Sequence, residues 1–226
     1  MTTVDPELAV QILQDLVRIP SINPDLVPGA PGEGAIAQYI CGRMQAWGLE
    51  VINRELAPGR HNAIGILRGS GGGRTLLFNG HTDTVMVDGM AEPFSGDAHE
   101  GKLYGRGAFD MKGSLAATLA ATCALAQSGV RLRGDVIFTY VADEEYASIG
   151  TEGIVADIRE GRLPHADAAV NTEPTGLKIG IGHKGFAWVE VETHGRAAHG
   201  SRPDLGVDAI VQMGKVLVEI DHLQKR

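Results

Sequence analysis

One stretch of the sequence constrains the fold more than any other. Residues 135–142 form an apolar, β-branched run that ends abruptly in three adjacent acids, Asp143, Glu144 and Glu145. The run is typical of a buried strand. Adjacent carboxylates repel one another, and burying them is costly unless a cation or hydrogen bonds compensate. These acids therefore mark either a solvated turn or a metal site at the end of a strand.

Composition narrows the class of protein. The chain has 226 residues, of which 43% are hydrophobic and 21% charged. These proportions are those of an ordinary globular protein with one or two domains. The formal net charge of -8 argues against nucleic acid as a partner, because phosphate binding needs a basic face.

Targeting signals and cysteine usage point to a cytoplasmic location. The amino-terminal residues lack the basic and apolar regions of a secretory signal, and we find no apolar run of about 18 residues that would span a membrane. Cys41 and Cys123 are the two cysteines. They are far apart in sequence, which favours buried thiols over a disulfide framework or a zinc ribbon.

Hydrophobic periodicity predicts helices alternating with short strands. The expected helices are 6–19, 33–47, 114–127 and 151–160, and the expected strands are 50–53, 62–67, 75–79, 135–142 and a small buried one at 168–171. Asp5 and Pro6 form the start signal of the first helix. This alternation favours an α/β domain with functional loops at strand ends.

The pattern changes after about residue 175. Residues 177–195 alternate at period two, as a half-exposed antiparallel strand or hairpin would. Residues 206–226 then predict an amphipathic helix. The glycine-rich segment 69–74 is a weak phosphate signal, because it lacks the Lys-Ser/Thr of a phosphate-binding loop and does not open a helix.

Acids and a histidine follow several of the predicted strands. In four separate loops the candidate side chains are His81, Asp83, Asp110, Glu144, Glu145 and Glu173. Histidine and carboxylate together suit catalytic zinc or a related divalent ion. Each loop alone has an ordinary explanation as a surface turn, a solvated acid pair or a helix N-cap, and the ordered combination favours a metal site.

These motifs resemble one known family. The segments His81-Thr82-Asp83, GRGAFDMKG at 105–113, Glu144-Glu145 and NTEPT at 171–175 are similar to those of the M20 metallopeptidases and N-acyl amino acid deacylases. Residues 194–210 resemble the family's lid segment. The resemblance covers nearly the whole chain.

The resemblance implies a fold and a domain division. It implies an α/β, zinc-exopeptidase-like catalytic domain, residues 1–177, with a central mixed sheet flanked by helices. Residues 178–226 would begin an incomplete α+β lid and dimerisation domain. A homodimer through this lid is the implied assembly.

The resemblance also implies metal ligands. His81 and Glu173 would bind one ion, Glu145 would bind a second, and Asp110 would bridge the two. The implied cofactor is two Zn²⁺ ions, with Co²⁺ or Mn²⁺ as substitutes.

Other implied roles concern proton transfer and orientation. Glu144 would be the general base, and Asp83 would accept a hydrogen bond from His81 and orient it. His199 matches a lid histidine that reaches the active site of a partner subunit. Asp143 has no implied role and is expected to be a solvated or hydrogen-bonding acid. His183 and His194 are expected to be structural.

The implied activity is hydrolysis of an amide bond in an N-acyl amino acid, as in the acetylornithine deacetylase and succinyl-diaminopimelate desuccinylase branch. The partner would be a small N-acyl amino acid or a short peptide, with no nucleic acid and no membrane. The alternatives are an amino- or carboxypeptidase of the same family, or a truncated, non-catalytic metal-binding fragment. Retention of Glu144 argues against the last, since a structural metal site needs no general base.

The sequence departs from the family pattern at its carboxyl end. Family members are longer, and their chain returns to the catalytic domain with a last histidine ligand that nothing in this sequence matches. A fragment and a naturally short chain are both open explanations. We favour the fragment, because the apolar face of the helix predicted at 206–226 has no complete domain to cover it.

Overall fold

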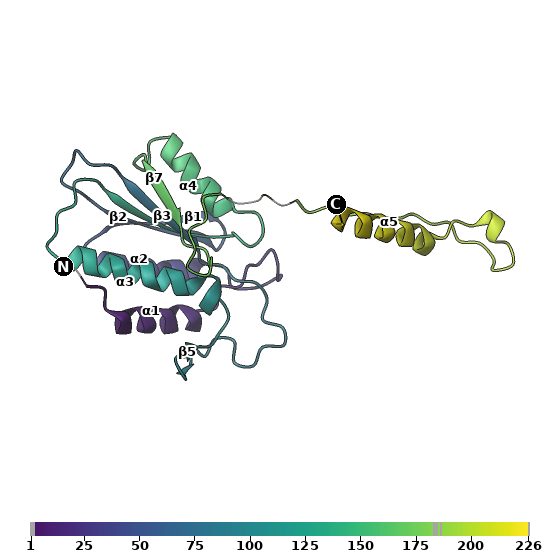
Figure 1. Ribbon diagram of the computed structural model, residues 1–226, viewed down its shortest axis with the longest axis horizontal. Coiled ribbons are helices and arrows are strands. Elements are labelled where there is room, and N and C mark those ends of the chain that lie inside the picture. Colours follow the sequence, from purple (N-terminus) through teal and green to yellow (C-terminus); the bar gives the residue numbers. More distant parts are fainter. Residues whose placement is uncertain (1–2, 183–184, 186, 226) are drawn as a thin grey trace. The chain divides into compact units, whose positions relative to one another are not determined.

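The computed structural model describes residues 3–182, 185 and 187–225. The chain divides into two compact units, Met1–Lys178 and Ile179–Arg226, and Figure 1 labels most of their helices and strands. This division lies one residue from the boundary expected from the sequence. The assignment of the units to a catalytic domain and a lid stays a prediction.

The first unit is built on a mixed five-stranded sheet. Its strands are β1 (Glu50–Ala57), β2 (Arg60–Leu67), β3 (Leu76–His81), β6 (Val136–Val141) and β7 (Ala168–Asn171), in the spatial order β1-β2-β6-β3-β7. The β1–β2 and β2–β6 pairs are antiparallel, and β3 runs parallel to both β6 and β7. The expected α/β fold with a central mixed sheet is confirmed.

Helices cover both faces of this sheet. They are α1 (Pro6–Arg18), α2 (Gly34–Ala46), α3 (Gly113–Gln127) and α4 (Ile149–Arg159). The first three pack in one hydrophobic cluster with Phe138 and Tyr140 of β6, whereas α4 packs against Ile137 and Val141 on the other side. Figure 1 shows α1, α2 and α3 on one face and α4 opposite. Successive side chains of β6 point to opposite faces of the sheet and thus contribute to two separate hydrophobic cores.

Local signals position the ends of α1 and α2. The Asp5 carboxylate accepts a hydrogen bond from the backbone N–H of Glu7 at 2.9 Å, so Asp5 caps α1 as expected. The helix ends at Arg18, before Pro20. Gly48, just beyond α2, has a φ of 84°, the left-handed conformation that closes a helix.

Strand β7 differs from its expectation. The short apolar run at 168–171 predicts a buried strand, but all four of its residues are exposed. β7 lies at the edge of the sheet, paired with β3, and none of its residues belongs to either hydrophobic cluster of the described chain. A short hairpin, β4 (Ala98–His99) with β5 (Lys102–Leu103), and the π-helical turn η1 (Ala108–Lys112) are also present and were not evident from the sequence.

The second unit contains the short helix η2 (Pro203–Leu205) and α5 (Ala209–Gln224). Asp208 caps α5 by accepting the backbone N–H of Val211 at 3.0 Å. The strand or hairpin expected at 177–195 is absent from the described part of that range, where the backbone finds no strand to pair with. His183 lies outside the described residues. Within the part of the chain that the structure covers, no helix has the length and hydrophobicity that a membrane span requires.

A glycine at the start of α4 provides a test of this packing. A Cβ at Gly150 would lie 2.5 Å from the backbone nitrogen of Ala142 and 2.8 Å from Oδ1 of Asn62, so the backbone itself must move. We expect Gly150→Ala to lower the free energy of unfolding by about 1–3 kcal/mol. Denaturant unfolding measures this change.

The matched control is Gly42→Ala, in the interior of α2. A Cβ at Gly42 meets nothing within 4 Å. Alanine should therefore stabilise the helix by about 0.5–1 kcal/mol relative to glycine. Equal effects of the two substitutions would contradict the close approach of α4 to the end of β6.

Candidate metal centre

Strand pairing brings the candidate loops together at one edge of the sheet. His81, the last residue of β3, aligns with Val141, the last residue of β6, and the N–H of Thr82 donates to the Val141 carbonyl at 2.8 Å. On the other side of β3, Asn79 aligns with Asn171, the last residue of β7. Because parallel strands end at the same edge, the loops after β3, β6 and β7 lie next to one another.

The proton on Nδ1 of His81 is held by a backbone carbonyl. The His81 side chain is 1% exposed, and Nδ1 lies 3.0 Å from the backbone carbonyl oxygen of Asp83. A carbonyl can only accept, so Nδ1 carries the proton and donates it. In the neutral ring, Nε2 then offers its lone pair, as a metal ligand must.

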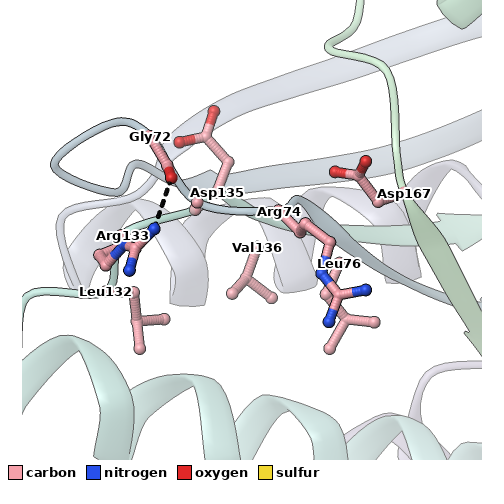
Figure 2. A pocket seen from close by; sticks show the side chains of 10 residues that line it. Gly72, Arg74, Leu76, Leu132, Arg133, Asp135, Val136 and Asp167 are labelled. Atoms are coloured by element: carbon pink, nitrogen blue, oxygen red, sulfur yellow. Dashed lines mark hydrogen bonds between the residues drawn. The ribbon is translucent and has the colours of Figure 1, made fainter.

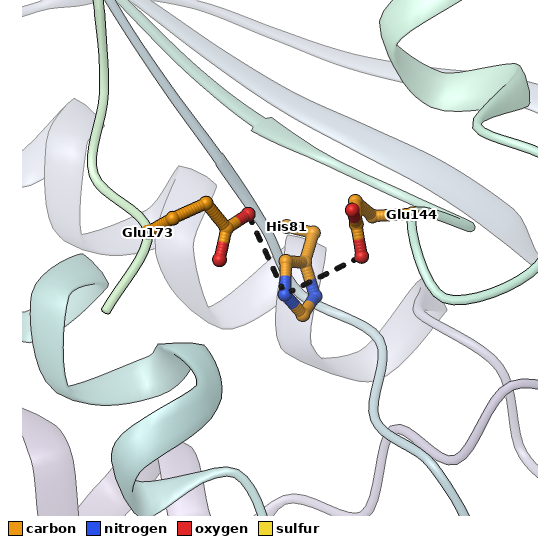
Figure 3. A group of neighbouring side chains, drawn as sticks. All are labelled: His81, Glu144 and Glu173. Atoms are coloured by element: carbon orange, nitrogen blue, oxygen red, sulfur yellow. Dashed lines mark ion pairs between the residues drawn. The ribbon is translucent and has the colours of Figure 1, made fainter. Parts of the chain in front are cut away.

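Carboxylates surround Nε2 of His81. The nearest oxygens are Oδ1 of Asp110 at 3.1 Å, Oε2 of Glu144 at 3.8 Å and Oε1 of Glu173 at 3.9 Å. Figure 3 shows the carboxylates of Glu144 and Glu173 directed toward the ring from two sides. Three of the four predicted loops therefore converge on the loop that carries His81.

Two triads of side chains have donor atoms close enough for a shared ion. One consists of His81, Glu144 and Glu173 and the other of His81, Asp110 and Glu145, with all donor atoms of a triad within 4.8 Å of one another. The family resemblance implies that Asp110 bridges the ion of His81 and Glu173 and the ion of Glu145. The second triad likewise joins Asp110 with Glu145, but the first places Glu144, and not Asp110, with His81 and Glu173. His81 belongs to both triads, and the partition among ions stays a prediction.

Electrostatics show that this donor set suits cations. Burial opposes protonation of His81, but hydrogen bonds to Asp110 and Asp83 prevail and raise its pKa to about 11. Burial raises the pKa of the Glu145 carboxyl to about 7, an effect that nearby acids reinforce. Burial also raises the pKa of Glu173. Such a cluster relieves its negative charge by taking up protons, and divalent ions would relieve it more completely.

Asp83 holds the turn that carries the two glutamates. Its carboxylate accepts the backbone N–H of Glu144 at 3.0 Å and that of Glu145 at 3.1 Å. Its Oδ1 also lies 3.4 Å from Nδ1 of His81. The sequence predicts only an orienting contact with the histidine, whereas the structure adds contacts with the loop after β6.

The sequence also missed the partners of Asp143. This side chain is 1% exposed, and its Oδ1 accepts from Arg60 Nη2 at 2.7 Å and from Asn23 Nδ2 at 3.0 Å. Arg60 also donates to the carboxylate of Glu33. Nothing in the sequence links either residue to the acids that follow β6. Asp143 is therefore the hydrogen-bonding acid of the two alternatives, and not the solvated one.

His199 lies in the second unit. Its side chain is exposed, and Nδ1 is 3.0 Å from Oγ of Ser201 within the same turn. His194, in the same unit, is also exposed and lies 3.7 Å from Oε2 of Glu192. Their expected roles stay predictions.

Two cavities flank the sheet edges. One of about 410 Å³ adjoins the cluster and is lined by Glu173 together with Phe109 and Pro174. Another of about 590 Å³, at the amino ends of β3 and β6, is drawn in Figure 2. There the guanidinium of Arg133 donates to the carbonyl of Gly72 at 2.8 Å. A Cβ at Gly69 or Gly73 would come within 3.0 Å of the backbone of Arg133 or Gly134, so close packing against the segment before β6 explains these two glycines.

A histidine and several carboxylates gathered at the strand ends of an α/β sheet define a candidate metal-dependent hydrolase. Residues 77–223 match the model of the peptidase family M20/M25/M40, and the chain belongs to this family.

Relatives with established names agree with this assignment. The chain is 33% identical over 204 residues to succinyl-diaminopimelate desuccinylase of Methylorubrum extorquens (strain PA1), covering 85% of this chain and 51% of the relative. It is 34% identical over 194 residues to acetylornithine deacetylase of Myxococcus xanthus, covering 83% of this chain and 49% of the relative. The chain thus spans about half the length of the curated relatives it matches.

A solved structure shares the fold. Human carnosine dipeptidase 1 superimposes with a TM-score of 0.65 at 25% identity, over 74% of this chain and 38% of that protein.

Proposed function

We propose that this chain carries the metal centre of a hydrolase that cleaves the amide bond of an N-acyl amino acid. The observation that carries the proposal is the pair of side-chain triads that share His81 at the edge of the sheet. The names of the two relatives, a desuccinylase and a deacetylase, support the class of substrate.

The residues that would hold the ions are His81, Asp110, Glu145 and Glu173. Zn²⁺ suits this mixture of imidazole and carboxylate, and Co²⁺ or Mn²⁺ are alternatives. When bound, the ions would supply Lewis acidity that polarises the scissile carbonyl and makes water a stronger acid. Because Nδ1 of His81 donates its proton to the Asp83 carbonyl, Nε2 is the ring nitrogen that would bind an ion.

Glu144 would be the side chain that moves a proton. Its carboxylate is exposed, and its backbone N–H donates to Asp83. As general base, its carboxylate would take a proton from the attacking water and pass it to the leaving amine. The exposed carboxylate can reach substrate, and the fixed backbone limits where it can go.

A peptidase of the same family is the second candidate function. The family's own description and the dipeptidase with the same fold favour it. In either case the partner would be a small molecule or short peptide. Assembly as a homodimer, action of His199 on a partner's site and a cytoplasmic location stay predictions.

The proposal is tested first by counting metal. The chain is dialysed after exposure to Zn²⁺, and zinc per chain is measured by elemental analysis. The two triads share Nε2 of His81, whose single lone pair binds one ion, so we expect at least one ion per chain, and a second would be held by carboxylates such as Asp110 and Glu145. Circular dichroism on the same sample establishes that the chain is folded. A folded chain that retains no zinc would contradict the proposal.

A substrate panel then separates the two candidates. N-succinyl and N-acetyl amino acids are compared with unblocked dipeptides at equal concentration and with zinc present. Faster release of the free amino acid from the acylated compounds supports the deacylase. Faster cleavage of the dipeptides supports the peptidase.

A further inference from the structure

The loop after β6 adopts a backbone conformation that needs an anchor. Asp143 has a φ of 64°, in the left-handed region that residues other than glycine rarely occupy. Its carboxylate is turned inward and buried, while the next side chain, Glu144, is exposed. Something must therefore hold Asp143 in this conformation, because the positions of Glu144 and Glu145 follow from it.

Arg60 supplies part of that anchor. Its side chain is 5% exposed, and Nη2 donates to Oδ1 of Asp143 at 2.7 Å. Its fork also binds Glu33, with Nε at 2.8 Å and Nη2 at 3.0 Å from the two carboxylate oxygens. Glu33 in turn accepts the backbone N–H of Asp143 at 3.3 Å. The remaining Nη1 pairs with Asp25. Both the side chain and the backbone of Asp143 are thus held.

Asn23 connects this anchor to Asp83, beside the candidate metal ligands. Its Nδ2 lies 3.0 Å from Oδ1 of Asp143 and 2.8 Å from Oδ2 of Asp83, so one amide group bridges two buried acids. The backbone N–H of Asn23 donates to the Thr84 carbonyl at 2.9 Å, and this bond holds the backbone of Asn23 beside the loop that follows β3. The carboxylate of Asp83 is the group that accepts the N–H groups of Glu144 and Glu145.

We propose that Asn23 and Arg60 are positioning residues of the metal centre, which act through Asp83 and Asp143 on the placement of His81, Glu144 and Glu145. This inference rests on the proposed function. Neither residue touches the cluster's donor atoms in the contacts described above, so the effect on metal affinity is indirect. Loss of a partner that orients a ligand typically costs 10- to 100-fold in metal affinity.

The alternative is that the network only stabilises the fold. A second ion pair, between a half-buried arginine of the sheet and a buried acid of α4, allows the two to be separated. Arg54 of β1 pairs with Asp157 of α4, whose side chain is 3% exposed, and none of the contacts given for either reaches the loop after β6. Lysine keeps the charge of arginine but loses its planar fork. Arg60→Lys and Arg54→Lys are therefore a matched pair.

The experiment measures zinc affinity and thermal unfolding of the 226-residue chain and its variants. Affinity is obtained by competition with a chelator at a temperature where every variant is folded. Unfolding is followed without metal. We expect Asn23→Leu and Arg60→Lys each to weaken zinc binding by about 10- to 100-fold, and Arg54→Lys to leave it within about twofold while lowering the unfolding temperature. Asn23→Ser, which keeps a small hydrogen-bond donor, should fall between the wild type and Asn23→Leu.

Two results would overturn the inference in distinguishable ways. If the wild type binds zinc and both Asn23→Ser and Arg60→Lys bind it equally well, the network is structural and the proposed function stands. If the folded wild type binds no zinc, the proposed function falls and the inference falls with it. Asn23→Ser and Arg60→Lys are mild enough to decide the question should Asn23→Leu fail to fold.

Discussion

Glu144→Gln is expected to lower the turnover number for amide hydrolysis by about 10²- to 10⁴-fold, the usual contribution of a general base. Glutamine has nearly the same shape as glutamate but cannot accept a proton at neutral pH. The backbone contact that fixes residue 144 runs from its N–H to Asp83, so the substitution leaves the turn intact. The measurement is steady-state hydrolysis of an N-acyl amino acid, with zinc per chain counted on the same sample.

The metal count matters because the structure admits a second role for Glu144. Its carboxylate lies in one triad with His81 and Glu173, close enough to share an ion. If Glu144 is the base, hydrolysis collapses while zinc is retained. If it is chiefly a ligand, zinc is lost together with activity. Glu152→Gln, an exposed acid in the first turn of α4, is the control and should change neither quantity. Unchanged hydrolysis in Glu144→Gln would make the assignment of the base wrong.

His81→Ala is expected to have the largest effect on metal binding. His81 is common to both triads, so its loss removes a donor from each. We expect zinc affinity to fall by more than the ~100-fold that loss of a merely orienting partner costs. The substitution also removes the basic group against which Asp110 lies at 3.1 Å, which leaves the carboxylates of the cluster without its compensation.

The test is elemental analysis after dialysis, compared with chelator competition. His99→Ala serves as the control, because His99 is exposed in β4 and stacks on Tyr104, at a ring distance of 4.3 Å. The control should retain the zinc of the wild type. Retention of a full complement of zinc by a folded His81→Ala variant would show that the cluster is not the metal site.

Much of the fold follows from local patterns in the sequence. The cap at Asp5 and the apolar periodicity of α1 to α4 predict these helices to within a few residues of their observed bounds. These signals act within one or two turns of the chain. The place that a strand takes in the sheet depends instead on contacts with distant parts of the chain. The run 168–171 is apolar whether it lies at the centre or at the edge, so its exposure was not predictable from its own residues.

The same distinction applies to the metal centre. His81, Asp110 and Glu173 stand out in the sequence because each follows a strand or a glycine-bordered loop. Arg60 and Asn23 give no such signal: an arginine in a strand and an asparagine in a proline-rich loop are ordinary residues. Their importance arises only when the chain folds and places Asn23 against an acid 120 residues away.

The register between β3 and β6 carries a consequence for how the chain selects its native state. A slip of one residue would move the His81 side chain to the opposite face of the sheet and separate it from the acids that follow β6. A dication would therefore bind the sheet in its native register and not the states in which β3 and β6 are misaligned. A ligand that recognises one state alone stabilises it by about 2.7 kcal/mol at 100 times its Kd. Metal binding would therefore favour the native alignment of β3 and β6 over a shifted one, and so couple occupancy of the site to the stability of the sheet.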